Sequence, residues 1–164
     1  MKILKIFCLV ILVSIQATYA QNVKKNKDAV QEAAIKKLID SKSYTFLAQS
    51  VTPLRGRNFS LSYGYDLRVN KDTIVAYLPF FGRAFVAPID PTDNGIEFTS
   101  TKFTYKSVAK KNGYLITIQP ADTKDVRQMF LDVSSNGYAS LRIINLNRDA
   151  ISFNGYLEPL KKTD

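Results

Sequence analysis

Apolar and small or polar residues alternate without a break from Phe59 to Val69. The odd positions carry Phe, Leu, Tyr, Tyr, Leu and Val, and the even positions carry Ser, Ser, Gly, Asp and Arg. Successive side chains of a β-strand point to opposite faces of the sheet. The alternation therefore predicts one continuous strand over 59–69, with a core face and a face toward water or a ligand.

Short segments of similar character follow along the rest of the chain, separated by turn residues. The predicted strands cover 44–52, 59–69, 73–78, 96–98, 103–108, 114–119, 126–133, 138–146 and 150–157. Asn-Gly pairs at 112–113 and 136–137 indicate hairpins, because both residue types tolerate positive φ. The short connections exclude parallel crossovers. We expect a mainly β domain at 44–160, an antiparallel meander that forms an open barrel or a two-sheet sandwich.

One stretch before these strands has helical periodicity. Val30, Ala34 and Leu38 recur every four residues, and Ile35 and Ile39 lie beside them. We expect an N-terminal helical segment at 21–43 whose apolar stripe packs on the β domain. A helix lying on a membrane surface is the alternative, but the stripe is short and lacks large aromatic side chains.

The first twenty residues have the layout of a secretory signal peptide. Lys2 and Lys5 form a positive head, 6–15 is apolar, and Ala17–Ala20 offers small residues for cleavage before Gln21. The apolar run is shorter than the roughly 20 residues of a membrane span. We therefore expect 1–20 to be removed and the protein to be exported, to the periplasm, the outer membrane or the outside of the cell.

The single cysteine of the chain lies inside the predicted signal peptide. Phe7 precedes Cys8 where a lipoprotein signal needs a small residue, so we do not expect lipidation. Without Cys8 the exported chain contains no cysteine, and no disulfide can form. With 46% hydrophobic and 23% charged residues, the composition is that of an ordinary folded domain stabilised by packing.

The charge balance favours anionic partners. The chain has 23 Lys and Arg against 14 Asp and Glu, and loss of 1–20 leaves 21 against 14, a net charge of +7. An exported protein meets acidic glycans and lipid headgroups rather than nucleic acid. We expect no nucleic-acid partner, and an anionic envelope surface is a candidate. Solvation of a helix face and of the chain ends is the simpler explanation for many of these charges.

The segment from Tyr77 to Phe85 combines proline, glycine and aromatic residues. Proline ends a strand ladder and glycine permits a bend, so we expect a strand that stops at Leu78, turns, and resumes at Arg83. Adjacent strand residues face opposite ways, so one of Phe80 and Phe81 is expected to be exposed. The candidate ligand-binding residues are Tyr77, Phe80, Phe81 and Arg83, an aromatic lip beside a cation. A barrel corner with both rings in the core is the alternative.

Residues for catalysis and metal binding are scarce. The chain has no histidine, the usual general base and transition-metal ligand. The stretch Asp90–Gly95 resembles a calcium loop, but the twelfth position holds Thr101 instead of a bidentate glutamate, so a turn is favoured. We expect no cofactor, no metal site and no enzymatic activity.

Four segments together resemble a known family. They are Tyr77-Leu-Pro-Phe-Phe-Gly-Arg-Ala84, Gly95-Ile-Glu-Phe98, Gly137-Tyr-Ala-Ser-Leu141 and Arg148-Asp-Ala-Ile-Ser-Phe-Asn-Gly155. In this combination, and over nearly all of the exported chain, the sequence is similar to the DUF4251 family of exported proteins from Bacteroidota. The resemblance implies an envelope protein with a β-rich fold. The family has no assigned function, so no catalytic residue is carried over.

Two classes of function remain open. The first is a non-catalytic envelope module that binds a small amphipathic, lipid-like or glycan ligand. The second is a structural or interaction protein that docks onto an envelope partner through its basic surface or a strand edge. A cavity lined by aromatic residues near Arg83 would favour the first class, and a filled core with a flat basic face would favour the second. The oligomeric state stays open.

Overall fold

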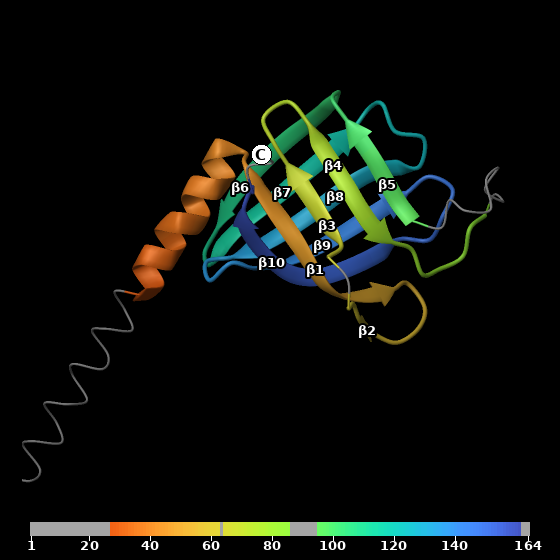
Figure 1. Cartoon of the computed structure of the whole chain (residues 1–164), viewed down its shortest axis with the longest axis horizontal. Coiled ribbons are helices and arrows are strands. Elements are labelled where there is room, and N and C mark those ends of the chain that lie inside the picture. The colour runs from red at the N-terminus through yellow and green to blue at the C-terminus, as the bar shows by residue number, and fades with distance from the viewer. Residues whose placement is uncertain (1–26, 63, 86–94, 162–164) are drawn as a thin grey trace, which may run out of the picture.

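The computed structural model describes residues 27–62, 64–85 and 95–161. The predicted signal peptide, and most of the stretch compared above with a calcium loop, lie outside these residues. Figure 1 shows one helix followed by a curved sheet. The helix covers 27–41. The strands are β1 (Tyr44–Pro53), β2 (Phe59–Ser60), β3 (Asp66–Val69), β4 (Ile74–Pro79), β5 (Gly95–Ser100), β6 (Phe103–Lys110), β7 (Gly113–Pro120), β8 (Val126–Ser134), β9 (Tyr138–Asn145) and β10 (Ile151–Pro159).

The strands form one antiparallel sheet that curls into a nearly closed barrel. The order is β5-β4-β3-β1-β10-β9-β8-β7-β6, and β2 pairs with β1 outside this path. The first and last long strands of the meander are neighbours, since β1 pairs with β10 from Tyr44 opposite Pro159 to Pro53 opposite Ile151. Its two free edges are β5 and β6, which follow each other in the chain. The expected mainly β fold is confirmed, as a barrel with one unpaired seam.

Large apolar side chains fill the inside of the barrel. Strands such as β3 and β4 alternate buried and more exposed residues, as one-sided burial requires. The largest fully buried side chains are Tyr44, Phe46, Phe153, Ile39, Leu67, Ile74, Leu78, Ile116, Ile118, Met129, Leu131 and Leu141. Because these residues occupy the interior, ligand sites must be sought at the ends, at the seam or on the outer surface.

The continuous strand predicted over 59–69 is wrong, because the structure has two strands there, β2 and β3, with a break between them. Leu61 donates to the carbonyl of Gln49 at 2.8 Å, and the Tyr65 carbonyl accepts from Ala48 at 2.9 Å. Two residues four positions apart thus bond to adjacent residues of β1, so the ladder is interrupted between β2 and β3. The alternation holds where the ladder resumes, since Leu67 is fully buried whereas Phe59 is exposed.

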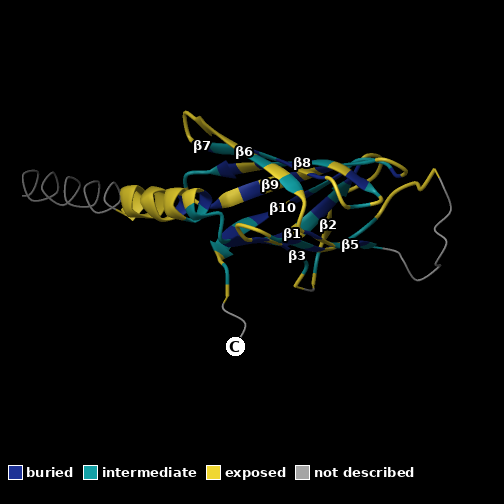
Figure 2. Cartoon of the chain, turned by 90° about the horizontal axis from the view of Figure 1, so that it is seen from above, coloured by how far each residue is buried: buried dark blue, intermediate teal, exposed yellow. Residues whose placement is uncertain are grey.

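The helix packs apolar side chains on the barrel only in its C-terminal half. Ile35 and Ile39 are buried, whereas Val30 is 71% exposed, so the apolar stripe predicted to include Val30 and Ala34 is wrong at its start. The N-terminal half projects beyond the strands, as Figures 1 and 2 show, and has no surface to pack on. Within the described residues, no helical segment has the length and apolarity needed to cross a membrane.

Glycine at the β8–β9 turn allows the close approach of the helix. Gly137 has φ of +87°, and a Cβ atom there would lie 3.1 Å from the Ile35 side chain. Gln31 donates from Nε2 to the Asn136 carbonyl at 2.6 Å. The helix therefore closes the end of the barrel where this turn lies.

The docking of the helix generates a stability prediction. Replacing Ile39 by alanine removes a side chain that is 1% exposed and should lower the free energy of unfolding by about 2 to 4 kcal/mol. The same truncation at Val30, which is 71% exposed, should cost less than about 0.5 kcal/mol. Urea denaturation followed by circular dichroism measures both, and equal costs would show that the helix does not dock.

Candidate functional site

Beside the seam, hydrogen bonds from side chains and backbone groups, and not a strand ladder, attach β5 and its corner with β6 to the β7–β8 and β9–β10 connections. The carboxylate of Asp122 accepts hydrogen bonds from the Ser100 hydroxyl and from the backbone N–H groups of Thr101 and Lys102, the latter two at 3.0 and 3.1 Å. The N–H of Ala121 donates to the Lys102 carbonyl at 2.7 Å. These bonds hold the corner between β5 and β6 against the connection between β7 and β8.

A buried arginine bridges the seam at the other end of β5. Arg148 is 7% exposed. It donates from Nη1 to the Gly95 carbonyl at 2.8 Å and pairs through Nη2 with the Asp125 carboxylate at 3.1 Å. Its guanidinium lies 5.4 Å from the centre of the Phe80 ring. One side chain from the β9–β10 connection therefore contacts segments that follow β4, begin β5 and precede β8.

Between these two contacts lies a crevice of about 250 Å³. It is lined by Gly95, Ile96, Glu97, Phe98, Asp122, Thr123, Lys124, Asp125, Val126, Asn145 and Arg148. Asn145 donates from Nδ2 to the Asp149 carbonyl at 2.9 Å, and its Oδ1 is buried with no hydrogen-bond partner among the described residues. A buried acceptor without a partner costs free energy, so a donor that reached Asn145 Oδ1 would gain a hydrogen bond there.

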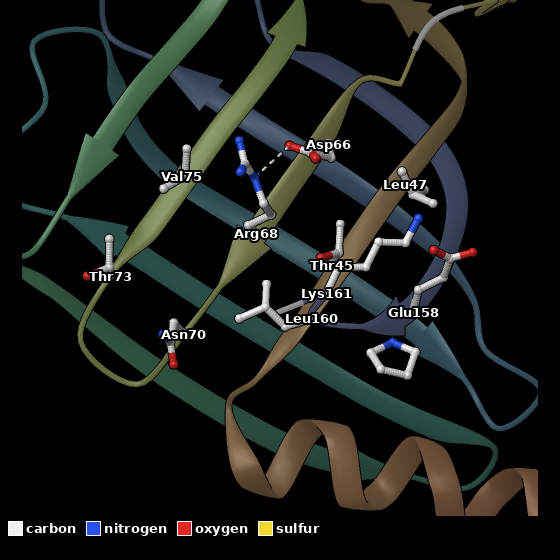
Figure 3. A pocket seen from close by; sticks show the side chains of 11 residues that line it. Thr45, Leu47, Asp66, Arg68, Asn70, Thr73, Val75, Glu158, Leu160 and Lys161 are labelled. Atoms are coloured by element: carbon white, nitrogen blue, oxygen red, sulfur yellow. Dashed lines mark ion pairs between the residues drawn. The ribbon is translucent and has the colours of Figure 1, made fainter. Parts of the chain in front are cut away.

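A second cavity, a groove of about 330 Å³, lies on the outside of the barrel (Figure 3). It is lined by Thr45, Leu47, Asp66, Arg68, Asn70, Thr73, Val75, Glu158, Pro159, Leu160 and Lys161. The floor belongs to β1, β3 and β4, and the last described residues form one wall. Asp66 and Arg68 pair across 3.3 Å in the groove. Its two carboxylates and two cations leave it without a net charge.

Of the two phenylalanines of the predicted site, Phe81 is exposed and Phe80 is not, as expected for adjacent residues that face opposite ways. Phe80 is half-buried, packs against the core and lies beside Arg148. Phe81 is 44% exposed, and its ring centre is 5.8 Å from that of Phe59. The chain after β4 does not resume a strand at Arg83, because only an isolated bridge joins Ala84 to Arg148.

The other two predicted site residues lie on separate surfaces. Tyr77 stacks on Tyr65 with ring centres 5.5 Å apart. Arg83 is exposed, and its carbonyl accepts a hydrogen bond from Asp149 N–H at 3.0 Å. The crevice and the groove contain neither of these residues in their linings, nor Phe80 or Phe81. That the four residues bind a ligand stays a prediction, but they do not surround one shared cavity.

Sequence reasoning missed Arg148, which has the cation-on-ring geometry expected of Arg83. In the sequence, Arg148 appears only as the first residue of the segment 148–155 that resembles the DUF4251 family. Its contact with Phe80 cannot be inferred there, because the two residues are far apart in the chain. Among the described residues, no cluster of three or more His, Cys, Asp or Glu is arranged to hold a metal ion.

The bridging arginine generates a second stability prediction. Arg148→Met keeps much of the side-chain volume but removes the donors to Gly95 and Asp125, and should cost about 3 kcal/mol of unfolding free energy. Arg68→Met is the matched control, since Arg68 is 47% exposed and its pair with Asp66 should contribute less than about 1 kcal/mol. Chemical denaturation distinguishes the two variants, and a small effect of Arg148→Met would show that the seam does not depend on it.

The hydrogen bond from Ser100, with those from the Thr101 and Lys102 backbone, lowers the pKa of Asp122 from its ordinary value of 3.8. A carboxyl group with a lowered folded-state pKa stabilises the fold above its unfolded pKa, and this stabilisation is lost as pH falls through the folded pKa. The stability advantage of the wild type over Asp122→Asn should therefore be constant above about pH 5 and shrink in more acidic solution. Urea midpoints across this range test it, and an advantage that does not change with pH would contradict it.

Comparison with known proteins gives a family and a fold. The family model described as a domain of unknown function, DUF4251, matches residues 26–157. The crystal structure of a DUF4251 family protein from Bacteroides eggerthii is similar with a TM-score of 0.56 at 18% identity, over 82% of this chain and 91% of that chain. At that identity the likeness shows the fold alone. No curated protein matches the sequence. The chain belongs to the DUF4251 family.

Proposed function

We propose that this protein is a non-catalytic binding module of the cell envelope, and that the seam crevice binds one sugar unit of a glycan. The observation that carries the proposal is Asn145, which lines the crevice and whose Oδ1 is buried with no hydrogen-bond partner among the described residues. The envelope location rests on the predicted signal peptide.

The lining of the crevice combines polar residues with apolar ones. Asn145 and Glu97 supply oxygen atoms to the lining, and the apolar residues of the lining are Ile96, Phe98 and Val126. A sugar ring has hydroxyl donors at its edge and C–H groups on its faces, which complements both. At about 250 Å³ the crevice is smaller than the about 300 to 1,000 Å³ typical of ligand pockets. It therefore fits a single unit, not a long acyl chain.

The charges of the lining favour a neutral glycan over a lipid-like ligand with an anionic headgroup. Glu97, Asp122 and Asp125 face Lys124 and Arg148, so the crevice has one excess negative charge. An anionic headgroup would be repelled by this balance. A neutral glycan unit is not.

Bonding within the seam explains why we propose binding and not catalysis. Asp122 and Asp125 are held by the seam contacts described above, so their oxygens serve the fold. Glu97 and Lys124 are exposed and are the charged side chains best placed to exchange hydrogen bonds with a ligand. The chain also has no histidine to act as a general base.

Titration with a panel of neutral mono- and oligosaccharides, followed by backbone amide NMR, tests the proposal. We expect at least one sugar to shift the signals of the crevice residues, and the double variant Glu97→Ala/Lys124→Ala to weaken its binding about tenfold or more, since two hydrogen bonds to charged groups are lost. The matched control is Glu158→Ala/Lys161→Ala, which removes one carboxylate and one ammonium group from the outer groove of Figure 3.

Two results would contradict this assignment. Shifts confined to the groove residues, abolished by the control variant, would move the site to the outside of the barrel. A panel that produces no shifts in the crevice would remove the glycan proposal.

The second class of function has its own supporting observation. The outer edge of β6 has no partner strand among the described strands, and residues 106–110 are all exposed. A partner protein could add a strand there. Lys106 and Lys110 also discourage edge pairing, so we rank this function second.

A further inference from the structure

Exposed apolar side chains gather at the end of the barrel opposite the helix. Nine large hydrophobic side chains are exposed among the described residues, and six of them belong to this end. Leu54 follows β1, Phe59 begins β2, Tyr77 lies near the end of β4, Phe81 and Phe85 follow β4, and Leu146 follows β9. We call Leu54, Phe59, Phe81, Phe85 and Leu146 the apolar rim.

Two contacts connect the segments that carry the rim. The rings of Phe59 and Phe81 lie 5.8 Å apart and join the segment before β3 to the segment after β4. The N–H of Phe85 donates to the carbonyl of Asn147 at 2.8 Å, next to Leu146. Five large apolar side chains exposed at one end of a domain indicate an interaction site.

The same segments carry a positive charge. Arg55, Arg57 and Arg83 are all exposed and alternate in sequence with the rim residues. Asp149 is the one acidic residue in the segments 54–60, 80–85 and 146–149, and it is half-buried. The rim segments therefore present apolar side chains among three exposed arginines, and the carboxylate of Asp125 beside Asn147 is paired with Arg148.

We infer that this end of the barrel docks on an anionic lipid surface. Phenylalanine and leucine side chains on connecting segments can enter the headgroup region, and arginine side chains can reach lipid phosphates while their stems stay among apolar groups. A second copy of the chain fits less well, because a two-fold contact would bring the three arginines of each copy against those of the other. The inference does not rest on glycan binding in the crevice.

Vesicle binding tests the charge of the rim. The described fold lies within 27–161, so the chain from Gln21 onward contains it. This chain should bind vesicles of phosphatidylethanolamine and phosphatidylglycerol more tightly than neutral phosphatidylcholine vesicles. Each arginine near the surface contributes about a factor of five in affinity, so Arg55→Gln/Arg57→Gln/Arg83→Gln should weaken binding roughly 100-fold.

A matched variant controls for net charge. Lys37, Lys106 and Lys111 are exposed on the helix and on the β6–β7 hairpin, away from the rim. Their triple replacement by glutamine changes the net charge equally but should weaken binding less than about threefold, because charges beyond a Debye length of about 10 Å are screened.

Tryptophan fluorescence tests which surface meets the lipid. The chain has no tryptophan, so Phe85→Trp gives a single probe on the rim. Tyr138→Trp gives one at the helix end, where Tyr138 is 64% exposed. Anionic vesicles with brominated acyl chains should quench the probe at position 85 and leave the one at position 138 unquenched.

The inference fails if the wild type has no preference for anionic vesicles, if the two triple variants lose affinity equally, or if the probe at position 138 is the one quenched. Binding to acidic polysaccharide with no binding to vesicles would also overturn it and identify a glycan as the occupant.

Discussion

The structure depends on closing a sheet whose two edge strands are consecutive in the chain. β5 and β6 are joined by only Thr101 and Lys102, and each is already paired on its other side with β4 or β7. Two neighbours linked so closely could form a hairpin, but here they diverge into opposite edges of one sheet (Figure 1). The polar groups along this divergence have no strand partner, so side chains or solvent must satisfy them. Asp122 accepts from the N–H groups of Thr101 and Lys102, and Arg148 donates to the carbonyl of Gly95.

Closure by side chains leaves a crevice where closure by strands would leave none. A backbone ladder sets neighbouring strands about 4.8 Å apart and leaves no room for a ligand. The side chains of Arg148 and Asp122 span a longer distance than a backbone hydrogen bond does. The crevice between them is lined by both of these side chains. Arg148 is suited to this position because its planar group can donate in several directions while it rests on the Phe80 ring. The groups that stabilise the fold and those that would contact a ligand are thus neighbours.

The two ends of the barrel differ in how their apolar residues are used. At one end Ile35 and Ile39 of the helix cover the β8–β9 turn and are buried. At the other end the apolar rim remains exposed among arginines. The helix lies at one end only, where the apolar side chains of its C-terminal half pack against the barrel (Figure 2). This asymmetry gives the molecule one closed end and one end available for interaction.

The sequence by itself determined the fold class and most strands, because one-sided burial imposes a two-residue period that can be read in segments such as 66–69 and 74–79. It also indicated that one of Phe80 and Phe81 would be exposed. It could not show the break between β2 and β3, since the alternation continues through 61–65 where the ladder does not. Nor could it show that Arg148 lies over the Phe80 ring or that Asp122 accepts a hydrogen bond from Ser100. These pairs are distant in the chain, and only tertiary structure decided them, because closing the barrel brings the seam residues together.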